Sequence, residues 1–229
     1  MDAWTTNTVQ AADRVSAFLW KVYGWMAVGL GLTAVVAFAV AGSPEILRTL
    51  VGNRLVFFGL VIAELGLVFY LSARADRMAP GTAAGLFTLY SALNGVTLSV
   101  VLLAYTGESV TTTFVVTAGM FGALALFGST TKRSLAGAGQ FFMMGLVGLI
   151  LASIVGVFWH SDALQFLISV VGVIVFTGLT AWDAQRLKQM ALALPAGQAG
   201  AYAIVGALSL YLDFINLFLM LLRFTGRRD

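Results

Sequence analysis

The sequence predicts an all-α integral membrane protein with seven transmembrane helices. Of its 229 residues 60% are hydrophobic and only 10% are charged, whereas a soluble domain carries about 25% charged residues. Apolar runs of about 18 residues or more recur along the whole chain, which is the length that crosses a bilayer. Short polar clusters rich in glycine, proline, serine and threonine separate these runs.

The seven helices are expected between the charged residues. In chain order the predicted ranges are 23–41, 55–73, 82–105, 110–128, 139–158, 164–183 and 201–222. Aromatic residues near the ends of the runs are typical of the membrane–water interface: Trp20, Trp25, Tyr70, Tyr105, Trp159, Trp182 and Tyr202. Residues 1–20 form a short polar segment without a visible signal peptide. Because no flexible linker divides the chain, residues 1–229 are interpreted as one domain.

Basic residues predict the orientation, because cytoplasmic loops carry an excess of lysine and arginine. The loops after the second, fourth and sixth helices are rich in them: Arg74, Arg77, Lys132, Arg133, Arg186 and Lys188. These loops and the N-terminus are therefore expected in the cytoplasm, with the protein in the inner (cytoplasmic) membrane. Seven full crossings then leave Arg223, Arg227 and Arg228 outside, against the rule, unless the last helix is re-entrant. The sequence leaves both alternatives open.

Composition also excludes several classes of protein. The chain has no cysteine, which excludes disulfides, thiolate metal sites and cysteine nucleophiles. The net charge of +3 comes from basic residues placed singly or in pairs at the ends of apolar runs. Such placement serves topology and lipid headgroups, so membrane lipids are expected partners and nucleic acid is not.

The last predicted helix contains an acidic residue, Asp213, near the middle of "SLYLDFINLFLMLLR". A charged side chain at this depth costs about 2.5–3.5 kcal/mol on insertion scales, so it indicates a functional or structural role. Ser209, Asp213 and Asn216 lie on one helix face. This polar stripe predicts a surface turned toward protein or water. The alternative is a buried hydrogen-bond anchor that only fixes helix packing.

Two other acidic residues lie inside or at the edge of an apolar run. Asp183 ends the sixth predicted helix, on a stripe with Thr177 and Thr180, and next to basic residues that could simply keep it solvated. Glu64 lies at the centre of the second helix, where it could be a protonated packing group or an ionised group facing a cation or water. Thr88, Ser91 and Asn94 share one face of the third helix, compatible with a pore lining or a tight helix contact.

A pair formed by Asp183 and Asp213 would sense pH. Two carboxylates in a medium of low dielectric constant cannot both ionise cheaply, so they share a proton. Arg74 is expected on the same side of the membrane as Asp183, where a salt bridge between them could close the bundle. Asp213 lies about 18 Å along its helix at 1.5 Å per residue. The two aspartates can meet only if the sixth helix continues past residue 183, or if the last helix starts nearer the surface.

Several segments together resemble the transmembrane Bax inhibitor motif family, in particular its bacterial branch. They are "VYGWMAVGLGLTA", "SALNGVTLS", "FGSTTKRSLAGAG", "FTGLTAWDAQRLKQM" and "LSLYLDFINLFLMLLR", in this order and spacing. Trp182 stands where many members have tyrosine before the aspartate, which keeps the aromatic ring.

The resemblance implies six helices around a central C-terminal helix. It also implies a pH-sensitive leak of calcium, with Asp183 and Asp213 as the sensor and Arg74 as a latch. Calcium and protons would then be the partners of the chain, with calcium passing through rather than being held as a cofactor. Glu64, Asn94, Ser209 and Asn216 are the further polar candidates for a pore or the bundle interior. Deprotonation could either strengthen the latch or separate the aspartates.

Two alternatives to a leak remain. Some bacterial members are linked to the restraint of a membrane-anchored quality-control protease, so the chain could be an interaction protein whose ion flux is incidental. An intramembrane aspartyl protease also uses two aspartates on adjacent helices. That class resembles a Gly-x-Gly-Asp pattern, whereas Leu210, Tyr211 and Leu212 precede Asp213 here. An enzyme is therefore not expected.

Overall fold

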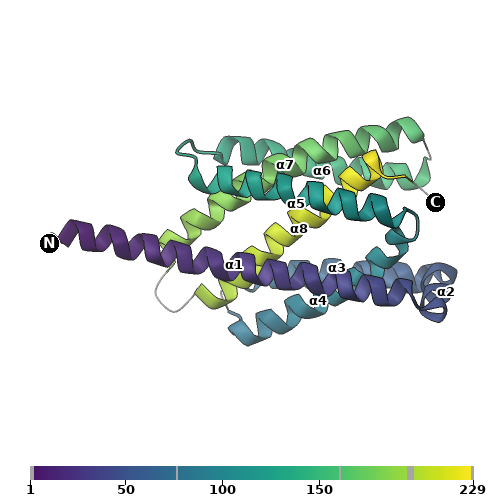
Figure 1. The fold of residues 1–229 in the computed structure, drawn as a ribbon, viewed down its shortest axis with the longest axis horizontal. Coiled ribbons are helices and arrows are strands. Elements are labelled where there is room, and N and C mark those ends of the chain that lie inside the picture. Colours follow the sequence, from purple (N-terminus) through teal and green to yellow (C-terminus); the bar gives the residue numbers. More distant parts are fainter. Residues whose placement is uncertain (1–2, 76, 160, 195–198, 228–229) are drawn as a thin grey trace. The chain divides into compact units, whose positions relative to one another are not determined.

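The described residues fold into eight α-helices (Figure 1). The computed structural model describes residues 3–75, 77–159, 161–194 and 199–227. The helices are α1 (Ala3–Ala41), α2 (Pro44–Gly52), α3 (Arg54–Ala73), α4 (Pro80–Leu102), α5 (Gly107–Thr130), α6 (Ala136–Phe158), α7 (Asp162–Ala193) and α8 (Ala199–Thr225).

Seven of these helices, all except α2, are long and apolar enough to cross a membrane. This confirms the predicted fold class and the predicted number of spans. Most predicted ends lie within three residues of the observed ones, but α1 begins at Ala3 and α7 continues to Ala193. The predicted ranges stopped where hydrophobicity fell. The added segments carry many residues with good helix propensity, so the helix itself persists into polar sequence.

The short helix α2 was not predicted, because Gly42, Ser43 and Pro44 were interpreted only as a break between spans. Proline is favourable at the first helical position, where its missing N–H would have no partner within the helix. Pro44 starts α2 in this way, and Asn53 both ends α2 and caps α3 by accepting from the Leu55 backbone N–H at 3.1 Å. The break therefore becomes a nine-residue helix.

The described residues divide into two compact units, and each is described by itself. The first comprises residues from 1–104 and 188–211. In it α1 runs along α4, and α3 packs against the same helix (Figure 1). Gly29 lies under the ring of Phe87, and Gly95 lies against the backbone of Thr33. These glycines let α1 and α4 approach closely, which is how helices pack where no hydrophobic force drives them together.

The second unit comprises residues from 105–187 and 212–229. Its core is a cluster of buried side chains from α6, α7 and the second half of α8: Leu149, Ile168, Val175, Phe176, Leu179, Leu217 and Met220. Gly128 of α5 lies directly against the backbone of Ala181 on α7, where a Cβ atom would overlap the carbonyl group. The rings of Phe114 and Phe121 pack edge-to-face on Phe214 of α8.

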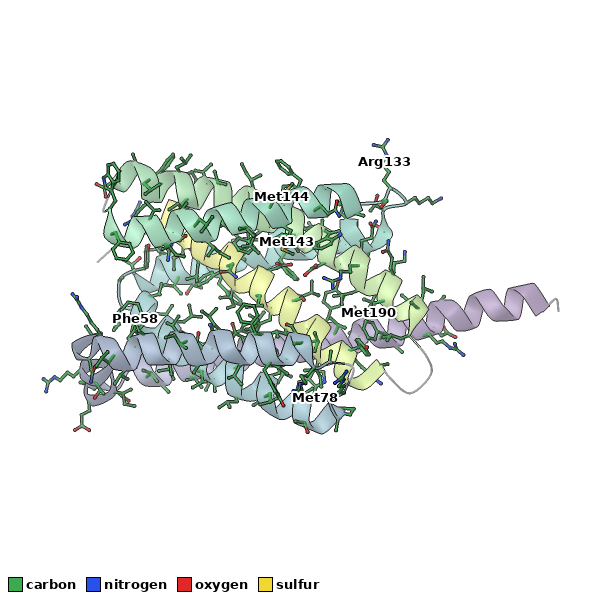
Figure 2. The ribbon with its side chains drawn as sticks, turned by 180° about the vertical axis from the view of Figure 1, so that it is seen from behind. Phe58, Met78, Arg133, Met143, Met144 and Met190 are labelled. Carbon is green, nitrogen blue, oxygen red and sulfur yellow. The ribbon has the colours of Figure 1, made fainter. Side chains whose placement is uncertain are left out.

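The C-terminal helix is the most buried of the spans. In its most apolar window 67% of residues are buried inside the protein, against 39% in α7 and 11% in α3 and in α6. Large apolar side chains are exposed on the other helices instead, such as Phe58 on α3 and Met143 and Met144 on α6 (Figure 2). Exposed apolar surface on this scale is typical of a face that contacts lipid.

Candidate functional site

Asp213 is a buried carboxylic acid inside the continuous helix α8. Its side chain is 6% exposed, and its Oδ2 atom has no hydrogen-bond partner among the described residues. The next residue, Phe214, lies 5.5 Å from both Phe114 and Phe121 between ring centroids, which holds this turn of α8 against α5. A buried polar atom without a partner is costly. A proton, a water molecule or a cation bound to the carboxyl group would remove this cost.

Asp183 lies in the same unit and acts electrostatically on Asp213. Helix α7 continues to Ala193, so Asp183 lies well inside the helix rather than at its end. Of the two conditions under which the aspartates could meet, the structure shows that the sixth helix continues past residue 183. Asp183 is partly exposed and Asp213 is buried, so the pair joins a more accessible acid to a less accessible one.

A cation lies near Asp183 on its own helix. Arg186 is three residues further along α7 and interacts electrostatically with the Asp183 carboxylate. Its guanidinium lies 5.5 Å from the centroid of the Trp182 ring, in a cation–π arrangement. Trp182 in turn covers Gly139 of α6, where no side chain would fit. The indole therefore fixes both the arginine and the helix that carries the acid.

The other polar residues of the two predicted stripes have different partners. Thr180 donates to the Phe176 carbonyl oxygen at 2.7 Å, while the buried Thr177 Oγ1 has no partner among the described residues. Asn216 donates to the Leu212 carbonyl oxygen of its own helix at 2.8 Å, and Ser209 is only partly buried. The Asn216 amide nitrogen is thus bonded within its own helix.

Glu64 is 8% exposed and lies in a polar cluster within the first unit. From α4, Thr97 Oγ1 lies 3.0 Å from Glu64 Oε1, and Asn94 Nδ2 lies 3.3 Å from Oε2. The face of α4 that carries Ser91 and Asn94 makes a tight helix contact, whereas Thr88, predicted on the same face, is exposed. This part of the face therefore makes a helix contact, and a role in lining a pore stays a prediction.

Sequence reasoning missed three members of this cluster, namely Thr33, Thr97 and Tyr211. Tyr211 is fully buried, its hydroxyl lies 3.0 Å from Asn94 Oδ1, and it also lies 2.6 Å from Thr33 Oγ1. Its ring packs edge-to-face on Phe87 and Tyr90. One signal was present in the sequence, because a tyrosine in the middle of an apolar helix usually finds a partner for its hydroxyl.

Arg74, the predicted latch, ends α3 and lies in the first unit, whereas both aspartates belong to the second. Its guanidinium lies 5.7 Å from the centroid of the Tyr70 ring, one turn earlier on the same helix. The latch role therefore stays a prediction.

The aspartate pair offers fewer oxygen atoms than a stable calcium site needs. The ion prefers about six to eight oxygen atoms, and the described residues contain no group of three or more metal-ligating side chains. Two carboxyl groups supply at most four oxygens, of which Asp213 Oδ2 is unused by the protein. This oxygen count does not match a site that would retain calcium.

Comparison with known proteins gives extensive matches. A family model described as "Inhibitor of apoptosis-promoting Bax1" matches residues 15–229. The chain is 49% identical over 225 residues to the inner membrane protein YbhL of Escherichia coli strain K12, covering 97% of this chain and 96% of the relative. It is 44% identical over 213 residues to an uncharacterized protein of Borreliella burgdorferi, covering 92% of each. A further uncharacterized protein, from Deinococcus radiodurans, is 44% identical over 218 residues, or 95% of this chain and 93% of the relative.

Proposed function

The chain belongs to the family of inhibitors of apoptosis-promoting Bax1, and from that premise we propose that it is a pH-sensitive leak channel for calcium, gated by Asp183 and Asp213. It is a multi-pass protein of the inner membrane, in keeping with the name of its Escherichia coli relative. The observation that carries the proposal is the buried Asp213 carboxyl group, with one oxygen unpaired and within electrostatic range of Asp183.

The proposed gate depends on the charge of the pair. When both acids are ionised they repel each other in a medium of low dielectric constant, and a shared proton removes that repulsion. Loss of the proton also leaves two anionic groups that attract a cation. The proton occupancy of the pair therefore changes both the packing between α7 and α8 and the affinity for calcium.

The test is calcium flux into liposomes that contain the purified protein, measured across a pH series. Flux through the wild type should change with pH, and a change of about 1.4 kcal/mol in the barrier alters it about tenfold. Asp213→Asn should make the flux independent of pH, because the amide cannot release a proton. Asp162→Asn is the matched control, since this acid lies in the exposed first turn of α7 and should leave the pH response intact.

A pH response that survives unchanged in Asp213→Asn would refute the sensor role. Copurification with a membrane-anchored protease that is unaffected by Asp183→Asn, together with a flux that does not respond to pH in the wild type, would favour the interaction role instead.

The latch is tested in the same assay. If Arg74 holds the path closed, Arg74→Gln should raise the flux at the pH where the wild type is least active. Arg77→Gln, three residues along the chain, provides the matched change of charge and should have less effect. The reverse order would assign the latch to Arg77.

A further inference from the structure

The polar cluster around Glu64 contains more hydrogen-bond contacts than protons to make them. Thr33 Oγ1 lies 2.8 Å from the Ser91 carbonyl oxygen and 2.6 Å from the Tyr211 hydroxyl, which lies 3.0 Å from Asn94 Oδ1. Each hydroxyl group has one proton to donate. The hydroxyl groups of Thr33 and Tyr211 therefore supply two protons for three contacts. With this orientation of the Asn94 amide, one of the contacts has no donor.

Turning the Asn94 amide over removes the shortage. Its Nδ2 then donates to the Tyr211 hydroxyl, Tyr211 donates to Thr33, and Thr33 donates to the Ser91 carbonyl oxygen. The oxygen and nitrogen of an asparagine amide are assigned from the surrounding hydrogen bonds, so both orientations use the same atomic positions. Each hydrogen bond in this series, which joins α1, α4 and α8, then has its own proton.

If the amide is turned, the Glu64 carboxyl group must carry a proton. Asn94 Oδ1 then faces Glu64 Oε2 across the 3.3 Å contact, and two oxygen atoms can form a hydrogen bond only if one of them carries a proton. Because an amide oxygen does not, the proton must be on the carboxyl group. Thr97 Oγ1 lies 3.0 Å from both Glu64 Oε1 and the Asn94 backbone carbonyl oxygen, and its one proton can be donated to either. A neutral carboxylic acid also avoids the cost of a charge at membrane depth.

We propose that Glu64 is a second proton-binding site. The orientation of the Asn94 amide depends on whether Glu64 carries the proton, and this orientation sets the direction of the hydrogen bonds to Tyr211 and Thr33. With the proton bound, donation runs from Glu64 through Asn94 and Tyr211 to Thr33. When the proton leaves to water, the amide turns its Nδ2 to the carboxylate, and Tyr211 donates to Asn94 Oδ1. The Thr33 hydroxyl then donates its one proton either to the Tyr211 oxygen or to the Ser91 carbonyl oxygen. No covalent bond other than the acidic O–H breaks.

Two further titratable side chains face Glu64. Tyr90 from α4 and Tyr211 from α8 both interact with it electrostatically. Tyr211 lies two residues before Asp213 on α8. The inference does not rest on the proposed calcium leak, because it concerns the contacts of the first unit alone.

The experiment is carbon-13 NMR of the full chain in lipid nanodiscs, with only the glutamate side-chain carboxyl carbons labelled. The chain has three glutamates, and the other two, Glu45 and Glu108, are exposed and serve as internal references. At neutral pH we expect two signals at the ionised position and one at the protonated position. The third should disappear in Glu64→Gln and persist in Asp213→Asn. Three ionised signals in the wild type would overturn the proposal.

A second arm tests the role of the amide. Tyr211→Phe removes the acceptor for Asn94 Nδ2, so it should change the pH at which the Glu64 signal moves. Tyr202→Phe is the matched control on the same helix, outside the cluster, and should leave that pH unchanged. An identical titration of Glu64 in Tyr211→Phe and in the wild type would refute the relay. Failure of the flux assay would leave both readouts unaffected.

Discussion

Gly95 shows how a single residue sets the spacing of two helices. A Cβ atom at this position would lie 2.7 Å from the Thr33 carbonyl oxygen and 2.8 Å from Val36 Cβ, inside van der Waals contact. Thr33 also belongs to the hydrogen-bonded cluster around Glu64, through its contact with Tyr211. The absence of a side chain at Gly95 therefore allows α1 to place Thr33 within reach of that cluster.

Gly95→Ala should destabilise the protein by about 1–3 kcal/mol, because the added methyl group must push α1 away from α4. The measurement is thermal unfolding of the purified protein in detergent. Gly85→Ala on the same helix is the control, since a Cβ atom there meets nothing within 4 Å, and its stability should be unchanged or slightly raised. Equal unfolding temperatures for the two variants would contradict this account.

At the scale of elements, Gln185 of α7 holds the segment between α5 and α6. Its Nε2 donates to the Arg133 carbonyl oxygen at 2.8 Å, and its Oε1 accepts from the Leu135 backbone N–H at 2.8 Å. Helix α6 has no side-chain cap of its own at Leu135. A glutamine from another helix therefore satisfies its free N–H, as helix starts require. Arg133 itself extends outward from this segment (Figure 2).

Gln185→Ala should free the segment at 131–135, because it leaves two backbone groups without a partner at a cost of about 1–3 kcal/mol. Hydrogen exchange at the Leu135 amide should become faster by an amount that matches this loss. Gln189→Ala, an exposed change of the same kind on α7, serves as control and should leave that rate alone. An unchanged Leu135 rate in Gln185→Ala would show that another group holds the segment.

At the scale of the whole molecule, contacts of the residue that follows α8 predict the side of the C-terminus. The Thr106 N–H donates to the Arg227 carbonyl oxygen at 3.1 Å, and the Arg227 N–H donates to Ser109 Oγ at 3.0 Å. Because α8 is one continuous helix of 27 residues and the residue just beyond it contacts the start of α5, we expect a full crossing rather than a re-entrant helix, with the C-terminus on the side where α5 begins. Arg228 lies outside the described residues.

Single-cysteine labelling can test this topology, because the natural chain has no cysteine. Glu108→Cys and Arg227→Cys should react with a membrane-impermeant thiol reagent from the same side. Lys132→Cys, at the other end of α5, should react only from the opposite side, which the positive-inside rule predicts to be the cytoplasm. Labelling of positions 132 and 227 from one side would refute the full crossing of α8.

The sequence alone determined the number of spans and the acids that need an explanation. Both depend on local properties, because the length of an apolar run and the depth of a charge within it can be counted along the chain. The limit of this method is visible in α7. Its hydrophobicity falls near Asp183, but backbone hydrogen bonding and good helix formers carry the helix to Ala193.

Only the tertiary structure decided which polar groups meet. Thr33 and Tyr211 are 178 residues apart, and Glu64 and Asn94 are 30 apart, yet each pair is in hydrogen-bond contact. Hydrogen bonds need their atoms within about 3 Å and in a suitable direction, which depends on the rotation and spacing of packed helices. A stripe of polar residues predicts that a face is buried, whereas its partner is chosen by the helix that packs against it.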